Sequence, residues 1–156
     1  METALIVSST DAGIKALFAL LKGLHLRDIQ FAMNSGEARR RLANQEYDLA
    51  VVNTPLRDEF GSDLACHIAE STTAGVMLLI KLEYAAEIKA KVEASGVFVL
   101  EKPVSRSMFQ YTVRMMETME HRLQMLKREN VRLQNKIEEI RLVDRAKLVL
   151  MEYLKM

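Results

Sequence analysis

The chain has 156 residues, 49% of them hydrophobic, with a formal net charge of +1 at pH 7. This length suits one ordinary domain with an appendage, and the near-zero charge gives no global attraction toward nucleic acid or membrane. The lone Cys66 excludes an internal disulfide. It is interpreted as a buried helix position. The N-terminus lacks a basic signal region and no apolar run approaches the roughly 20 residues of a membrane span, so we expect a soluble cytoplasmic protein without membrane contact.

Five short apolar runs alternate with segments of helical spacing. The runs are residues 4–7, 29–32, 49–52, 76–80 and 97–100. Between them, apolar residues recur three or four positions apart, as do Ile14, Leu17 and Leu21. Strands that are apolar on both faces and separated by helices are typical of a parallel sheet covered on both sides. The pattern predicts an α/β domain with a five-stranded parallel sheet.

Turn residues divide the predicted elements. We expect Asp11 to cap the first helix and Asn34-Ser35-Gly36 to open the second. Ser95-Gly96 is expected to end the fourth, because glycine accepts the left-handed conformation that often closes a helix.

The chain changes character after Pro103. From Ser105 onward there is no Gly or Pro, and strong helix formers continue almost to Met156, which predicts one very long helix. Within it, two seam positions repeat every seven residues: Phe109, Met116, Leu123, Asn130 and Ile137, interleaved with Thr112, Met119, Leu126, Leu133 and Ile140. This heptad pattern predicts an intermolecular coiled coil. The alternative is an amphipathic helix packed on its own domain, but a stripe on the order of 45 Å long is too long for a compact domain to bury.

Asn130 favours a parallel, in-register homodimer, because it can pair with its twin across the seam. The charged positions that flank the seam favour pairing less, since Arg122 of one chain and Lys127 of the other would repel each other. The dimer is therefore expected to be held by its seam. The dimerisation residues are Met116, Met119, Leu123, Leu126, Asn130, Leu133, Ile137 and Ile140.

The first part of the chain resembles the receiver domain of bacterial response regulators. The resemblance rests on the alternating strands and helices, on Asn53 at the end of the third run, and on Leu100-Glu101-Lys102-Pro103. It implies a flavodoxin-like (βα)5 receiver fold with strand order 2-1-3-4-5.

The resemblance also implies a degenerate phosphoacceptor site. Receivers use two acids after the first strand, an aspartate after the third, a hydroxyl residue after the fourth and a lysine after the fifth. Here Ser8 and Ser9 replace the acids, Asn53 replaces the aspartate, and the hydroxyl position falls on Ile80 or Lys81; the remaining match is Lys102. An amide is no nucleophile and serine hydroxyls cannot offset the dehydration of Mg²⁺. We therefore expect no phosphotransfer, no metal, no cofactor and no enzymatic activity.

What remains at this site is a cationic pocket made of Lys102, Lys81 and the serine hydroxyls. It could hold an anion, or form hydrogen bonds to Asn53 and Glu101 that hold one conformation. We favour the second interpretation, because the side-chain carbonyl of Asn53 is a ready acceptor for Lys102. The helix face that carries Tyr84 would then stay constant.

The stretch from Lys136 to Met151 resembles the opening helix of an ANTAR domain, carried by Asp144-Arg145-Ala146-Lys147 and Leu150-Met151. Leu148 departs from the pattern, where glycine is common. The family of transcription antitermination regulators couples a receiver, through a coiled coil, to a three-helix module that binds hairpins in leader RNA. The resemblance implies an incomplete ANTAR module here, with RNA-contact candidates Arg141, Arg145 and Lys147. Alternatively these residues form a solvated helix face with Glu138, Glu139 and Asp144.

The sequence thus predicts a receiver-like domain over 1–106, a coiled-coil dimerisation helix over 107–140 and the start of an ANTAR domain over 141–156. The predicted function is a non-phosphorylatable response-regulator-like antiterminator, homodimeric, that binds an RNA hairpin in its complete form. The alternative is a pseudo-receiver interaction module that dimerises and docks a partner signalling protein. A phosphoryl-accepting enzyme is disfavoured by the missing residues.

Overall fold

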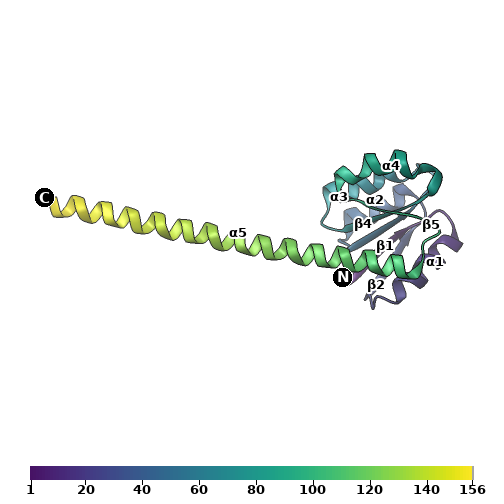
Figure 1. Ribbon diagram of the computed structural model, residues 1–156, viewed down its shortest axis with the longest axis horizontal. Helices are drawn as coiled ribbons and strands as arrows, with labels where there is room; N and C mark the ends of the chain where they lie inside the picture. Colours follow the sequence, from purple (N-terminus) through teal and green to yellow (C-terminus); the bar gives the residue numbers. More distant parts are fainter. Residues whose placement is uncertain (156) are drawn as a thin grey trace. The chain divides into compact units, whose positions relative to one another are not determined.

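The computed structural model describes residues 1–155, which form two compact units, residues 1–114 and 115–155. The first unit contains β1 (Thr3–Val7), α1 (Asp11–Lys22), β2 (Asp28–Ala32), α2 (Ser35–Asn44), β3 (Leu49–Asn53), α3 (Ser62–Ser71), β4 (Gly75–Lys81), η1 (Leu82–Tyr84), α4 (Ala85–Val92), η2 (Glu93–Ser95) and β5 (Phe98–Lys102). The helix α5 (Arg106–Lys155) begins in the first unit and makes up the second (Figure 1).

The five strands form one parallel sheet in the order β2-β1-β3-β4-β5. This order confirms the predicted flavodoxin-like fold. The fifth strand runs from Phe98 to Lys102, later than the predicted run from Val97. In the register of the sheet, Asn53 lies opposite Leu79 and Lys81 lies opposite Lys102. The parallel register therefore brings the carboxyl ends of the strands to one edge.

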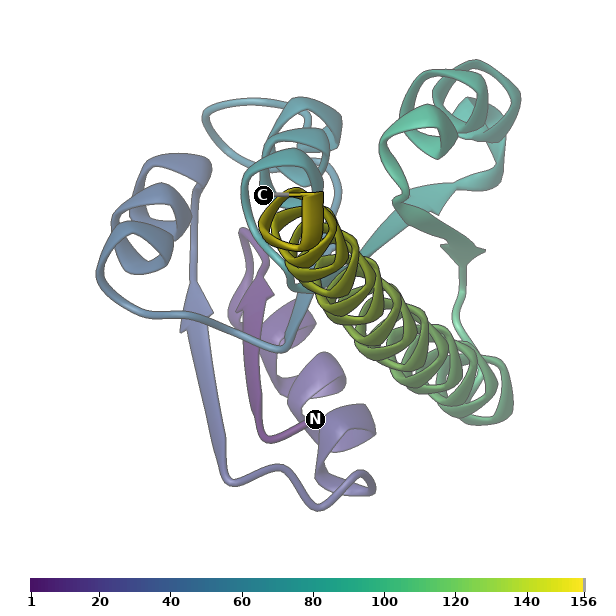
Figure 2. The same ribbon diagram turned by 90° about the vertical axis from the view of Figure 1, so that its left-hand side faces the viewer.

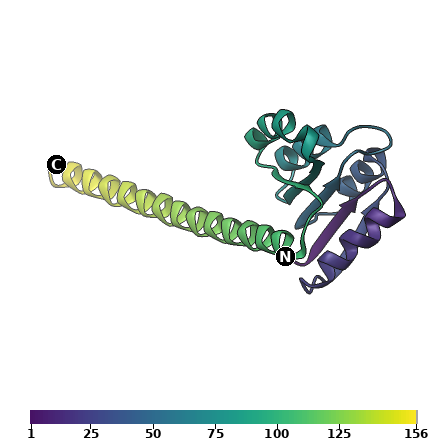
Figure 3. The same ribbon diagram turned by 45° about the vertical axis from the view of Figure 1, so that its right-hand side comes forward.

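Both faces of the sheet are covered by helices, as Figures 2 and 3 show. The face that includes Leu5 and Val7 forms the main core with α2, α3 and α4. Cys66 of α3 is partly buried against this core. On the other face lie α1 and the first turns of α5, which bury their own apolar side chains: Ile14, Leu17, Leu21, Phe109 and Val113. Two-sided burial explains why the strands read as continuous apolar runs.

The turn predictions hold with one exception. Asn34 caps α2, since its side chain accepts a hydrogen bond from the backbone of Glu37 at 2.8 Å. Gly96 closes the turn after α4 at φ +84°. Asp11, however, is not the cap of α1: Thr10 has the extended backbone and accepts the bond from the amide of Gly13. Asp11 is instead the first helical residue, where its carboxylate complements the helix dipole.

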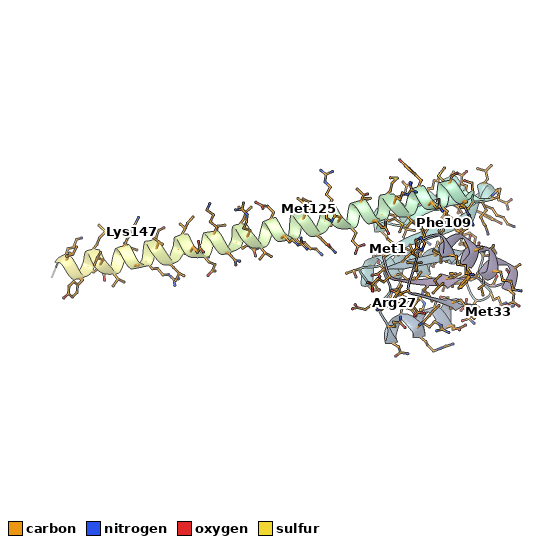
Figure 4. The ribbon with its side chains drawn as sticks, turned by 90° about the horizontal axis from the view of Figure 1, so that it is seen from below. Met1, Arg27, Met33, Phe109, Met125 and Lys147 are labelled. Atoms are coloured by element: carbon orange, nitrogen blue, oxygen red, sulfur yellow. The ribbon has the colours of Figure 1, made fainter. Side chains whose placement is uncertain are left out.

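The predicted long helix is confirmed, but the heptad residues along α5 have two different environments. Phe109 and Thr112 are 0% and 6% exposed within the first unit, so their expected place in an intermolecular seam is wrong. Met116 is also buried in the single chain. From Met119 to Ile140, the apolar seam residues are 46–60% exposed. Side chains project outward along α5, among them Met125 and Lys147 (Figure 4). Among residues 1–155, no helix has both the length and the apolar content of a membrane span.

Candidate functional site

Three of the predicted pocket residues meet at the carboxyl edge of the sheet. Ser8 directly follows β1, Asn53 ends β3 and Lys102 ends β5. Lys102 donates to the side-chain carbonyl oxygen of Asn53, with Nζ 2.9 Å from Oδ1. The amide nitrogen of Asn53 donates in turn to Ser8, with Nδ2 3.2 Å from Oγ. Lys102, Asn53 and Ser8 thus form one chain of hydrogen bonds, which we call the Lys–Asn–Ser relay.

One neighbour that the sequence did not single out, Thr54, also contacts the relay. The backbone carbonyl of Thr54 accepts a second hydrogen bond from Lys102, and the Thr54 hydroxyl, itself buried, donates to the carbonyl of Leu79 at 2.7 Å. Thr54 is thereby fixed to β4. Lys102 consequently has two neutral oxygen acceptors, both supplied by residues at the end of β3.

The first turn of α1 lies against the relay. A Cβ atom placed on Gly13 would come within 2.3 Å of Ser8 Oγ and 3.0 Å of Asn53 Nδ2. Only glycine fits this approach without movement. Glycine inside a helix costs about 1 kcal/mol relative to alanine, so its presence in α1 is the sequence feature that could have indicated a close contact. The pocket is therefore filled by the chain itself on this side.

Lys102 is held in a setting that disfavours its charge. Partial burial lowers the pKa of Lys102, and the positive charge of Lys81 lowers it further. Lys81 is exposed and lies opposite Lys102 in the register. Glu101, the second partner considered for Lys102, pairs instead with Lys89, with Nζ 3.1 Å from Oε1. The site therefore retains cationic character without a carboxylate on Lys102.

Ser9, the second serine after β1, takes no part in the relay. Its hydroxyl donates to the backbone carbonyl of Pro55 at 3.3 Å. Ser9 therefore ties the loop after β1 to the loop after β3. Of the five predicted residues, the structure joins Ser8, Asn53 and Lys102, places Lys81 close enough to act on Lys102, and directs Ser9 elsewhere.

The acids of the loop between β3 and α3 are also occupied. Asp58 accepts hydrogen bonds from the backbone amides of Ser35 and Gly36 at 2.9 and 3.0 Å, and the Ser35 bond is the largest cause of its lowered pKa. Glu59 accepts from the amide of Leu64 at 3.1 Å. Both carboxylates therefore accept hydrogen bonds from backbone amides at the N-termini of helices, Asp58 at α2 and Glu59 at α3.

The relay does not fit Mg²⁺, the ion that receivers hold. Magnesium prefers carboxylate oxygens in near-ideal octahedral geometry. The side-chain oxygens available at the relay belong to Ser8 and Asn53, and each already accepts a hydrogen bond. Across residues 1–155, no group of three or more His, Cys, Asp or Glu side chains is placed to hold a metal ion. No phosphoryl-transfer step can be derived from this arrangement.

A groove of about 380 Å³ lies beside the relay, lined by Pro55, Phe60, Ser62, Lys81, Tyr84, Glu87, Ile88 and Lys91. Phe60 and Tyr84 pack edge to face, with ring centroids 5.5 Å apart and planes at 72°. Lys91 forms an ion pair with Asp63 at 2.8 Å. The groove combines an aromatic wall with the exposed Lys81, and it places Tyr84 in contact with the loop after β3.

The second unit carries the other predicted site residues on α5. Its apolar seam residues from Met119 to Ile140 are exposed, as are Asn130, Arg141, Arg145 and Lys147. Arg141 and Arg145 are four residues apart and thus share one side of the helix. The single chain supplies no fixed geometry for these cations beyond the helix itself.

Several solved structures similar to this chain are response regulators or their receiver domains. The chemotaxis response regulator CheY4 of Vibrio cholerae is 14% identical with a TM-score of 0.64, and the match covers 74% of this chain and 98% of that one. The receiver domain of an HD domain-containing protein from Pseudomonas fluorescens is 21% identical with a TM-score of 0.67, over 79% and 91%. The beryllofluoride-activated NtrC4 receiver domain dimer is 20% identical with a TM-score of 0.66, over 74% and 96%.

No family model and no curated protein matches the sequence. The chain has the receiver fold of response regulators, and at these identities the likeness concerns the fold.

Proposed function

We propose that this chain is a response-regulator-like protein whose receiver is held in one state and cannot be phosphorylated. The Lys–Asn–Ser relay carries the proposal, because it fills the place where receivers hold a nucleophile and a metal. An amide nitrogen has its lone pair delocalised into the carbonyl and does not attack a phosphoryl group. The protein then acts by binding, in the cytoplasm, and not as an enzyme.

The relay also accounts for a fixed signalling state. Asn53 is held from both ends, by Lys102 at its oxygen and by Ser8 at its nitrogen. Neither bond depends on a bound ion. When the site residues already hydrogen-bond to one another, no ligand at this site shifts the equilibrium between receiver conformations. Regulation then depends on assembly or on another partner.

Assembly is proposed to occur through α5. An exposed seam of apolar residues on a helix is costly in water and is buried when it meets a second seam. The proposed arrangement is a parallel homodimer, in which each Asn130 faces its twin and the two amides can bond to each other. The exposed seam residues from Met119 to Ile140 support this pairing.

The proposed output is transcription antitermination by RNA binding through a complete ANTAR module. The sequence resemblance around Asp144-Arg145-Ala146-Lys147 supports it, and Arg141, Arg145 and Lys147 are exposed and free to meet phosphates. A second candidate is a pseudo-receiver that docks a partner protein without an RNA role. The groove with the Phe60–Tyr84 pair favours this candidate.

The receiver part of the proposal is tested with beryllofluoride and Mg²⁺. We expect no change in the melting temperature, because a ligand that does not bind cannot stabilise the fold. A receiver that carries the acidic pair and the aspartate serves as the positive control. A Mg²⁺-dependent stabilisation above about 1 kcal/mol would contradict the proposal.

The output is tested by gel-shift titration at physiological salt. The 156-residue chain is compared with a version extended by two further ANTAR helices, each against a leader hairpin and a scrambled RNA. We expect the extended protein to prefer the hairpin and the 156-residue chain to bind both weakly, because unfixed cations give salt-sensitive attraction without preference. Equal affinity of the extended protein for both RNAs would favour the docking module.

A further inference from the structure

The middle of α5 is strongly basic although the whole chain is nearly neutral. From residue 122 to residue 136, a single acid, Glu129, stands among five cations: Arg122, Lys127, Arg128, Arg132 and Lys136. All of these side chains are exposed. Glu129 is engaged by Arg132 three residues on, with Oε1 2.6 Å from Nη2. Five cations against one acid make the net charge of this segment positive.

The heptad register places four cations on the rims of a parallel pair. The first seam positions are those of Leu123, Asn130 and Ile137. The residue just before each of them lies beside the seam, and it faces the residue of the second copy whose number is five higher. Arg122 then faces Lys127 of the second copy, and Lys136 faces Arg141. By symmetry each juxtaposition occurs twice. The rim positions between them, Glu129 and Gln134, offer no compensating pair across the interface.

Like charges placed opposite each other oppose pairing unless an anion lies between them. The two cationic levels, 14 residues apart, are separated by about 21 Å along the helix at 1.5 Å per residue. A linear polyanion can contact both levels, whereas a small anion can contact only one. A sugar-phosphate backbone supplies regularly spaced charges, and arginine binds phosphate through its planar, forked donors.

We propose that Arg122, Lys127, Lys136 and Arg141 of two paired α5 helices form a cationic belt that binds the sugar-phosphate backbone of RNA. The inference rests on the proposed pairing of α5. It adds three cations, Arg122, Lys127 and Lys136, to the RNA-contact candidates Arg141, Arg145 and Lys147. RNA binding and pairing stabilise each other, because RNA binds the juxtaposed cations of the dimer more tightly than the separated ones of the monomer. The belt reads no sequence, because it contacts backbone only.

The belt predicts opposite responses to salt. Without RNA, added salt screens the repulsion between facing cations and tightens the dimer. With RNA, added salt weakens binding, because condensed counterions released into a more concentrated solution gain less entropy. The slope of log K against log[salt] is about −0.7 per phosphate neutralised on a single strand. Each response is measured by sedimentation and by fluorescence anisotropy with an unstructured 20-nucleotide RNA.

The decisive variant is Lys127→Glu with Lys136→Glu in the full chain, which leaves Arg141, Arg145 and Lys147 in place. In a parallel pair these changes turn both repulsive juxtapositions into attractive ones. The dissociation constant of the dimer should therefore fall about fivefold, while the affinity for the RNA should fall by about tenfold or more. The matched control is Lys15→Glu with Arg40→Glu, which makes the same charge change at exposed positions of the first unit. The control is expected to change both constants by less than about threefold.

Each outcome other than the expected one contradicts a specific part of the proposal. Equal loss of RNA affinity in variant and control shows general charge attraction and overturns the belt. A less stable dimer in the variant contradicts the parallel juxtapositions, and so overturns both the belt and the parallel arrangement. If poly-glutamate binds the chain as tightly as the RNA does, the belt binds an acidic protein instead of RNA. A wild-type monomer contradicts the proposed pairing itself, whereas a dimer whose RNA affinity is unchanged in the variant contradicts only the belt.

Discussion

Phe109 and Leu123 occupy the same seam position of the heptad, two repeats apart, but their environments differ. Phe109 is 0% exposed inside the first unit, whereas Leu123 is 57% exposed in the second. The seven-residue spacing is unbroken between them. A heptad pattern therefore indicates that a helix face will be buried, and does not indicate whether its own chain or another chain buries it.

Polar groups differ between the two units in the same way. In the first unit, Asn53, Thr54 and Asp48 have hydrogen-bond partners from distant parts of the same chain. In the second unit, Glu129 and Arg132 form a local pair three residues apart on the same helix. The exposed seam residues from Met119 to Ile140 are open to contact with a further chain.

The largest expected effect comes from Phe109→Ala. Removing a fully buried phenylalanine should cost about 3–5 kcal/mol of the free energy of unfolding of the first unit. Leu123→Ala, at the equivalent seam position, should leave that unit unchanged. Urea denaturation followed by circular dichroism in the near ultraviolet, which reports on tertiary packing, measures the difference. Equal destabilisation by both substitutions would remove the distinction between the two environments.

Leu126→Asp is expected to convert the dimer into a monomer with a folded first unit. A carboxylate facing its twin in the seam is neither solvated nor paired, and should raise the dissociation constant by about 100-fold or more. Met125→Asp is the matched control, since Met125 is exposed but lies outside the seam. Sedimentation at tens of micromolar separates the outcomes: a wild-type monomer, or a dimer in both variants, contradicts the seam.

Asp48→Asn should lower the free energy of unfolding of the first unit by about 1–2 kcal/mol. The reason is that the Asp48 carboxylate accepts hydrogen bonds from the backbone amides of Glu2 and Thr3 at 2.7 and 3.2 Å. The bond from Glu2 is the largest cause of the lowered pKa of Asp48. A lowered pKa contributes stability that is present above the unfolded value of about 3.9 and is lost as pH falls through the folded value. The stabilities of wild type and variant should therefore converge as pH falls below about 4. A constant difference down to pH 2 would contradict the assignment.

The smallest expected effect is on Lys102 itself. Lys81→Gln removes one of the two causes of its lowered pKa, so the pKa of Lys102 should rise toward the ordinary lysine value while burial still holds it below. Titration of the lysine side chains by nuclear magnetic resonance measures the shift. Lys89→Gln, which changes a lysine paired with Glu101, is the control and should leave the Lys102 pKa unchanged.

Local sequence was sufficient for the elements and for part of the site. The apolar runs and helix formers predicted five parallel strands and α5, since period and propensity act within a few residues. The fold resemblance placed Ser8, Asn53 and Lys102 at one sheet edge, and the Lys102–Asn53 bond follows from donor and acceptor chemistry. The Asp11 cap was wrong because Thr10, one residue earlier, has the extended backbone that a cap needs.

Only the tertiary structure decided how those residues are used. The Thr54 carbonyl on Lys102, the Gly13 backbone against Ser8, and the turning of Ser9 to Pro55 all depend on how far one loop lies from another. Phe109 is buried for the same reason, since the first turns of α5 pack on the first unit. Sequence determines what each segment can bury or bond, whereas the distances that select among those options arise when strand register and helix packing are set together.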